Sequence, residues 1–482
     1  MQSSVPAPKR LGTVEWLICI IATIGFAFDI YELLMLPLIL KPALATLGGV
    51  GPDGLALLIP GKPEFTEWAR ILFFVPAIFG GIFGLLGGWL TDRFGRRRIL
   101  TASIMLYAVS AFAAGYSTTL WQLLICRSLV FIGVCVEFVA AVAWLAELFP
   151  NPRQRERVLG FTQAASSVGG LLVALANGWC VTWAADLPAI HGGHEAWRYT
   201  LISGLLPAIP LLLIRPFLPE SPVWQQMKAE GKLRRPSLLA LFQPELRRAT
   251  LMSAVIFASC YGMAFGAIQH LPQIIPGLAD VKAQVKTRQG EVTAQAQAAG
   301  QAAPPRALIA AGKQVEEQRA AEVQKWQEFG GLSGRLALAV LVVHIVSRRN
   351  LLRIFHLPAL VFVPLFFWWL SQNMNAAGTL DLAKWGAAVA GFLVVGTFSF
   401  WGNYLPVIYP VHLRGTGESF SANIGGRILG TSAAWLTFTF SAAIPPSPAR
   451  IALTAAVVAG IFALVGAVLT HWLPEPKGGG EE

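Results

Sequence analysis

The chain has 482 residues, of which 55% are hydrophobic and 13% are charged, and this composition excludes a water-soluble protein of that size. The net charge of +11 does not indicate nucleic-acid binding, because no DNA- or RNA-binding motif accompanies it and the basic residues lie in short loops between apolar segments. The five cysteines lie within apolar segments without a C-x-x-C pair, so neither a disulfide framework nor a zinc site is expected.

Apolar segments recur along the whole chain, and each is long enough to cross a hydrocarbon layer of about 30 Å. The first follows Lys9 and Arg10 without a small-residue cleavage site, which favours a spanning helix over a signal peptide. The pattern predicts an all-α membrane protein with twelve transmembrane helices near residues 14–38, 69–90, 97–117, 120–148, 158–184, 198–218, 249–275, 329–347, 354–372, 383–405, 417–443 and 449–473.

Lysine and arginine residues are concentrated in alternate loops, which predicts a multi-pass protein with both termini in the cytoplasm. We expect it in the plasma membrane, which is the inner membrane if the source is bacterial. The basic residues of these loops are Arg93, Arg96, Arg97 and Arg98, then Arg153, Arg155 and Arg157, then Lys228, Lys232, Arg234 and Arg235, then Arg348, Arg349 and Arg353, and finally Arg414.

Two loops are longer than the others. Residues 219–248 are polar and basic, as expected of a cytoplasmic linker between a bundle of six helices at 1–218 and a second bundle at 249–482. Residues 276–328 form an unusually long extracytoplasmic insertion. Its second part, 307–327, predicts an amphipathic helix, and its first part is expected to be disordered. We interpret the insertion as tolerated, with a lid or a partner-docking role as the alternative.

Three short patterns recur after roughly 250 residues, which indicates duplicated halves with a site between them. Leu-Pro-Glu ends both the sixth and the twelfth helices, at Leu218 and Leu473. An Arg-x2-Gly pattern opens the fifth and the eleventh helices, and a pair of arginines follows the second and the eighth helices: Arg157 and Gly160, Arg414 and Gly417, Arg96 and Arg97, Arg348 and Arg349.

The loop after the second helix reads Gly88-Trp-Leu-Thr-Asp92-Arg93-Phe-Gly95-Arg96-Arg97-Arg98. It resembles the signature motif of the major facilitator superfamily, in which two pseudo-symmetric bundles of six helices carry substrates by alternating access. Gly88 lets helices approach closely, Gly95 permits a tight turn, and Asp92 can pair with a basic residue or a helix N-terminus. In the second half the aspartate is replaced by His344 and the glycine by Ser347, which predicts a weaker or pH-sensitive copy.

The fourth helix carries Arg127, Glu137 and Glu147, in a region similar to that of sugar porters and metabolite:proton symporters. Intramembrane charges are costly unless they face the bundle interior. Glu147 is expected to pair with Arg153 or Arg157. The complete set of predicted gate residues is Gly88, Asp92, Arg93, Gly95, Arg96, Glu147, Arg153, Arg157 and Arg414.

Asp29 and Glu32 share one face of the first helix, at a depth similar to that of Arg127. Sugar porters are similar in using a first-helix aspartate and a fourth-helix arginine as a proton-coupling pair. The resemblance implies that Asp29, Glu32 and Glu137 form the protonatable set, with Arg127 leaving Asp29 when the substrate binds. A static salt bridge that only fixes helix packing is the alternative.

Polar residues on four helices are candidates for substrate binding: Arg127, Gln163, Asn177, Arg335, Asn423 and Arg427. Gln163 resembles the position of a substrate-contacting glutamine in sugar porters. The paired glutamines of hexose porters are absent from the seventh helix, which disfavours a hexose. The loop from Pro406 to Gly417 resembles that of aromatic-acid symporters.

The sequence therefore predicts a transporter, with no enzymatic activity, that moves a small polar metabolite, an organic acid first of all, by proton symport. We expect it to work as a monomer in the lipid bilayer, with no cofactor, metal or nucleic acid. A sugar or polyol porter, a uniporter and an exporter are alternatives within the same fold. A membrane sensor that uses the long loop for signalling is the alternative from another class.

Overall fold

The computed structural model describes residues 11–51, 56–60, 62–149, 151–214, 217, 219–231, 237–410, 413–443 and 447–476. These residues form helices and no β-strand. Of the described helices, nine are long and apolar enough to cross a membrane. The predicted all-α membrane fold is confirmed.

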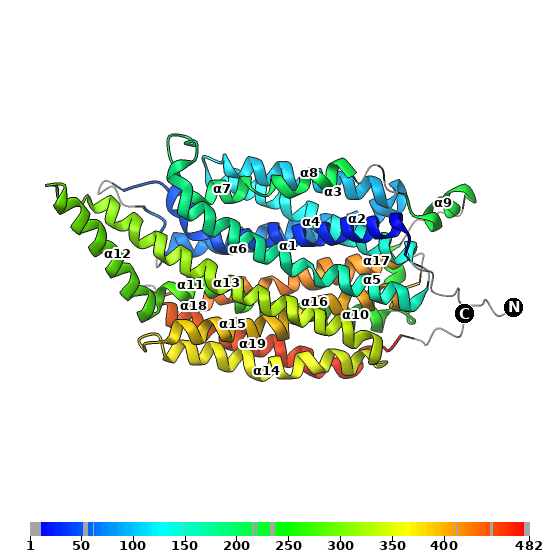
Figure 1. Ribbon diagram of the computed structural model, residues 1–482. Coiled ribbons are helices and arrows are strands. Elements are labelled where there is room, and N and C mark those ends of the chain that lie inside the picture. Colours follow the sequence, from blue (N-terminus) through cyan, green and yellow to red (C-terminus); the bar gives the residue numbers. More distant parts are fainter. Residues whose placement is uncertain are drawn as a thin grey trace.

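The helices form two groups that lie side by side (Figure 1). A short helix, α9 (Pro222–Ala229), and a 3₁₀ turn, η3 (Leu238–Phe242), lie between the groups in the sequence. The first group contains α1 (Thr13–Leu47), α2 (Pro63–Phe94), α3 (Arg96–Gly115), α4 (Leu120–Leu148), α5 (Pro152–Ala164), α6 (Ser166–Trp183), η1 (Ala184–Asp186), α7 (Ala196–Ile202) and α8 (Leu205–Ile214).

The second group begins after this linker and contains α10 (Arg247–Gly266), η4 (Ile268–His270), α11 (Leu271–Ile274), η5 (Ile275–Gly277), α12 (Ala279–Ala298), α13 (Pro305–His344), α14 (Arg348–Gln372), α15 (Thr379–Val394), η6 (Val395–Thr397), α16 (Phe398–Ile408), α17 (Arg414–Ser419), η8 (Phe420–Gly430), α18 (Ser432–Ser441), α19 (Pro448–Leu469) and η9 (Thr470–Trp472). We call the end of the molecule that carries α9 the linker end, and the end from which α12 projects the hairpin end (Figure 1).

Three of the twelve predicted spans are not long, uninterrupted apolar helices in the structure. The span predicted at 198–218 is divided into α7 and α8. The span at 329–347 is the last part of α13, where Arg335 lowers the apolar character of the segment. The span at 417–443 is divided into three pieces because residues Phe420–Gly430 form a π-helix, a geometry that is frequent at functional sites.

The insertion is helical from its beginning, so the prediction of disorder in its first part is wrong. Residues Ala279–Ala298 form α12, which packs antiparallel to the first half of α13. The polar composition suggested disorder, but Ala, Gln, Lys and Glu are strong helix formers. The helix predicted at 307–327 is confirmed, and it continues without a break into the membrane as one helix of 40 residues, or about 60 Å.

The repeat in the sequence has a three-dimensional counterpart at the linker end. The carboxylate of Glu220 accepts hydrogen bonds from the backbone N–H groups of Arg96 (3.0 Å) and Arg97 (3.1 Å). In the second half the carboxylate of Glu475 accepts bonds from the N–H groups of Arg348 (2.8 Å) and Arg349 (3.1 Å). Each Pro-Glu motif therefore satisfies the free N–H groups at the start of a spanning helix.

The turn between α2 and α3 depends on Gly95, whose φ angle is +98°. A Cβ at this position lies 2.5 Å from Oε2 of Glu220. We expect Gly95→Ala to destabilise the protein by about 1–3 kcal/mol, because an L side chain is strained at this φ and displaces Glu220. The measurement is the midpoint of thermal unfolding of the purified protein. Gly178→Ala is the control, since a Cβ there meets no atom within 4 Å, and equal midpoints for both variants contradict the prediction.

Candidate functional site

A small cavity of about 30 Å³ lies between the two helix groups. A cavity of this size holds only a few water molecules, so it must expand before an organic substrate fits. The residues that line it come from both groups and include polar, charged and aromatic side chains: Phe26, Asp29, Ile30, Phe138, Gln163, Ser166, Phe257, Tyr261, Arg335, Phe398 and Arg427. Four of the predicted site residues, Asp29, Gln163, Arg335 and Arg427, are therefore brought together here.

Both arginines of the cavity come from the second helix group and are buried. Arg335 donates hydrogen bonds to the carbonyl oxygen of Gln163 (3.1 Å) and to the hydroxyl of Ser166, which belong to the first group. Of the guanidinium nitrogens of Arg335, Nε and Nη2 have no hydrogen-bond partner among the described residues. Arg335 therefore bridges the groups and keeps donors available for a ligand.

Arg427 approaches the first helix group from the π-helix η8. Its guanidinium lies 5.3 Å from the ring centroid of Tyr261, and Asp29 acts on it electrostatically across the cavity. The Nη1 atom of Arg427 has no hydrogen-bond partner among the described residues. The cavity thus combines two cations from one group with one acid from the other.

Aromatic rings form much of the remaining wall. Tyr261 stacks on Phe398 with ring centroids 4.5 Å apart, and Phe26 meets Phe138 edge to face at 6.2 Å. Arg335 lies 5.6 Å from the ring centroid of Phe398. An aromatic wall of this kind favours binding of the flat apolar part of a ligand, while the arginines favour binding of an anionic group.

The predicted partner of Arg127 is different in the structure. Arg127 is fully buried and donates a hydrogen bond from Nη2 to the carbonyl oxygen of Glu32 (3.1 Å), and the Glu32 carboxylate acts on it electrostatically. Glu32 packs against Gly204, between α7 and α8, inside the first group. The expected pairing of Arg127 with Asp29 is therefore wrong, because Asp29 faces the cavity one turn away.

Three further predicted residues are buried but lie outside the set that lines the cavity. Glu137 is buried on α4. Asn177 accepts a hydrogen bond from the hydroxyl of Thr200 (3.1 Å) within the first group. Asn423 donates to the hydroxyl of Ser419 (3.1 Å) and packs against Gly84 of α2.

The two groups touch closely at the linker end. A Cβ at Gly88 lies 3.0 Å from the carbonyl oxygen of Gly415, and the hydroxyl of Ser419 donates to the carbonyl oxygen of Gly84 (2.8 Å). An ion pair of 2.5 Å joins Glu156 on α5 to Arg348 on α14. This end of the cavity is closed.

The predicted partner of Glu147 is also different. Its carboxylate binds Arg96 (2.9 Å) and accepts a hydrogen bond from Ser221 (2.5 Å). Arg153 and Arg157, expected to pair with it, are exposed. The α5 helix turns these two side chains outward, whereas Arg96 at the start of α3 is 7% exposed.

Two other predicted gate residues, Arg93 and Arg414, lie near aromatic or acidic side chains. Arg93 lies 5.0 Å from the ring centroid of Trp89 on the surface of α2, and Arg414 lies within electrostatic range of Glu147 and Glu418. The side chain of Asp92 lies outside the described residues.

The groups also touch at the hairpin end. Gln273 donates to the carbonyl oxygen of Pro37 (3.2 Å), and Arg70 donates to the hydroxyl of Thr439 (3.3 Å). The rings of Phe73 and Phe438 lie 5.6 Å apart. The cavity is therefore occluded at both ends.

Sequence reasoning missed two acids at the contacts between groups, the buried Glu328 and the half-buried Glu156. Glu328 is 1% exposed, and a Cβ at Gly170 overlaps its carboxyl group. It lies seven residues before Arg335 on the same helix face, a spacing that could have revealed it. Glu156 and the aromatic lining gave no such signal, because their partners lie far away in the sequence.

Comparison with known proteins identifies this architecture. The family model described as "Sugar (and other) transporter" matches residues 63–254. A probable 4-methylmuconolactone transporter of Cupriavidus pinatubonensis is 25% identical over 412 residues, covering 84% of this chain and 79% of the relative. The 4-hydroxybenzoate transporter PcaK of Pseudomonas aeruginosa is 27% identical over 380 residues, covering 75% of each chain.

Among solved structures, the proton:xylose symporter XylE of E. coli superimposes with a TM-score of 0.66 at 19% identity, covering 96% of each chain. The chain thus has the fold of the major facilitator superfamily and is similar to its sugar porters and metabolite transporters. The fold and the relatives are those of membrane transporters, not of enzymes.

The Glu156–Arg348 ion pair joins the groups at the linker end, with side-chain exposures of 19% and 11%. We expect Glu156→Gln to weaken closure there by about 1 kcal/mol, a roughly fivefold shift toward the open form. The measurement is the rate at which a thiol reagent labels Ala339→Cys, which is buried beside Gly160 between the groups. Arg153→Gln, an exposed residue of the same helix, is the control, and equal labelling rates in the two variants argue against the role of the pair.

Proposed function

We propose that this chain, which has the major facilitator fold, imports a small organic acid together with protons. The observation that carries the proposal is the occluded cavity between the two helix groups, lined by Arg335 and Arg427 from one group and by Asp29 from the other. A site shared between two groups and closed at both ends is the geometry that alternating access requires.

The substrate class follows from the charges and rings of the cavity. Two buried guanidinium groups with free donors favour a carboxylate over an uncharged sugar. The stacked rings of Tyr261 and Phe398 favour an unsaturated or aromatic body. The printed names of the two relatives, transporters of 4-methylmuconolactone and of 4-hydroxybenzoate, agree with this class.

The coupling that we propose uses Asp29 and Arg427. While the cavity is empty, the guanidinium of Arg427 interacts electrostatically with Asp29 across it. A substrate carboxylate that binds Arg427 competes for this cation, so Asp29 then takes up a proton from the open side. Glu32 and Glu137 are the further acids of the protonatable set, with Glu32 acting through Arg127.

The orientation of the transporter in the membrane follows from the proposed topology. We propose that residues 1–218 and 249–482 are the moving halves, that 219–248 is a cytoplasmic linker, and that the hairpin end faces outward. The described basic loops, at the starts of α3, α5 and α14, lie at the linker end, as expected of a cytoplasmic surface. Each closed end would then open in turn through its own contacts, Glu156 with Arg348 at one end and Arg70 with Thr439 at the other.

The purified protein in proteoliposomes with an alkaline interior is expected to accumulate a radiolabelled acid from a panel of aromatic, dicarboxylic and sugar acids. An uncoupler should abolish accumulation above equilibrium, because the proton gradient supplies the free energy. Neutral sugars and amino acids in the same panel serve as controls. Accumulation of a neutral sugar in place of any acid would overturn the substrate class, and equilibration without accumulation would overturn proton coupling.

Asp29→Asn tests the proposed coupling residue. We expect at least a tenfold loss of gradient-driven accumulation, because the amide cannot carry the proton, with exchange of labelled for unlabelled substrate retained. The measurement compares both modes in the same vesicles. Glu291→Gln, at an exposed position of α12, should leave both unchanged. Normal accumulation by the Asp29→Asn variant excludes the residue as the coupling site.

A further inference from the structure

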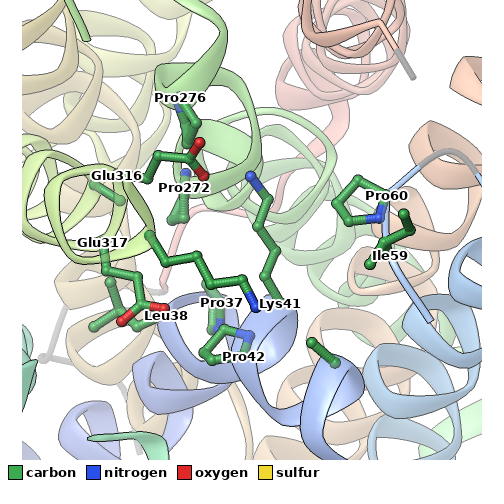
Figure 2. Close-up of a pocket in the computed structure, with 13 residues that line it drawn as sticks. Pro37, Leu38, Lys41, Pro42, Ile59, Pro60, Pro272, Pro276, Glu316 and Glu317 are labelled. Carbon is green, nitrogen blue, oxygen red and sulfur yellow. The ribbon is translucent and has the colours of Figure 1, made fainter. Parts of the chain in front are cut away.

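A second pocket lies at the hairpin end, apart from the central cavity. It has a volume of about 110 Å³, and its walls come from α1, the loop before α2, the end of the α10–η5 segment and the extended part of α13. Figure 2 shows Lys41 of α1 on one wall and Glu316 and Glu317 of α13 on another. The apolar part of the lining consists mainly of prolines with Leu38 and Ile59.

The charged side chains around this pocket are held apart. Lys41, Lys313, Glu316 and Glu317 all line it, and within the described chain none of them forms a hydrogen bond or an ion pair. Glu316 and Glu317 act on Lys41 only electrostatically. Lys41 is only partly exposed, so its ammonium group has lost part of its hydration without gaining a direct partner. Such a cation beside an apolar wall suits a carboxylate with an apolar body.

The insertion holds one wall of the pocket in place. Asp280 at the start of α12 accepts hydrogen bonds from the N–H groups of Gly378 (3.0 Å) and Leu380 (2.9 Å), and Glu322 binds Lys384 (2.7 Å). These contacts fix the hairpin to α15 of the second group. Toward the first group the extended part of α13 makes weaker contacts, such as that of Gln318 with Thr182 (3.3 Å), whereas the part of the helix that carries Arg335 bridges the groups. The pocket therefore lies where the two groups must separate if the hairpin end opens.

We propose that this pocket is an entry site at which Lys41 binds the carboxylate of the substrate before the central cavity opens. The inference deepens the proposed function and rests on it. Lys41 is nine residues beyond Glu32 on α1, or about 14 Å along the helix, so the pocket lies on the path from the hairpin end toward the acids of the first group. The α12–α13 insertion gains a role, because without it the pocket has no outer wall.

The charge of the pocket depends on pH through Glu317, which lies outside the spanning part of α13. Burial raises the pKa of Glu317 to about 7, Lys313 and Lys41 oppose the rise, and Glu316 adds to it. Above this pH the two lysines and two glutamates sum to zero charge. Below it Glu317 is neutral and the pocket is positive, so carboxylate binding strengthens as the outer pH falls through about 7.

The experiment measures the charge preference of the pocket directly. Ala45→Cys places a thiol in its wall, and the probes are a sulfonate and a trimethylammonium methanethiosulfonate of similar size. At pH 6 we expect the ratio of anionic to cationic labelling rates to be about threefold or more above that at Gln297→Cys, an exposed position of α12 with no charge within four residues. The unsubstituted protein gives the background of the native cysteines.

Further substitutions distinguish an effect of the pocket's charge from an effect on folding. Lys41→Gln should lower the ratio of anionic to cationic labelling rates at both pH 6 and pH 8. Glu317→Gln should keep this ratio high at pH 8. Lys286→Gln, on the exposed face of α12, should leave the ratio unchanged at both pH values. Benzoate should slow labelling more than benzyl alcohol. Equal ratios at the two cysteine positions, no effect of Lys41→Gln, or equal protection by both compounds overturns the entry site. Labelling requires no transport, so failure of the proposed function is detected separately by the uptake assay.

Discussion

The cost of placing charges in a membrane interior constrains this structure more than any other term. An unpaired charged side chain at the bilayer centre costs about 3 kcal/mol or more, so each intramembrane acid and arginine must find a partner or line a polar cavity. Arg127 meets Glu32 inside the first group, and Arg335 meets Gln163 and Ser166 across the groups. Charges held this way favour defined arrangements of the two groups, because sliding one group past the other breaks several bonds at once.

The two halves also satisfy their polar groups through matching contacts. In each, a glutamate after a proline accepts hydrogen bonds from the start of a spanning helix, and the proline carbonyl accepts one from a buried aromatic side chain: Trp144 to Pro219 (3.2 Å) and Tyr404 to Pro474 (2.7 Å). The contacts between halves include the Glu156–Arg348 ion pair and hydrogen bonds that water can replace. Rigid halves joined by replaceable contacts are what alternating access needs, and the π-helix that carries Arg427 lies at this junction.

The hairpin formed by α12 and the extended part of α13 changes the contacts between the groups at the hairpin end. It is anchored to the second group through Asp280 and Glu322 and reaches the first group through weaker contacts, so it enlarges the outer junction without locking it. In our proposal it forms the wall of a pocket where a substrate anion pauses above the occluded cavity. The proposal explains why Lys41 lines this pocket without an ion-pair partner among the described residues: its ammonium group is available to the carboxylate of the ligand.

The sequence by itself determined the membrane class, most of the spans, the repeat and the glycine turn at Gly95, because these depend on local composition, spacing and backbone conformation. It also selected Asp29, Gln163, Arg335 and Arg427, since buried polar residues in apolar helices have few other uses. Only the tertiary structure decided their partners. Arg127 meets Glu32 and Arg96 meets Glu147 because helix rotation and packing set which side chains face each other. The aromatic wall and the pocket at Lys41 arise from segments far apart in the chain, which no local pattern can place together.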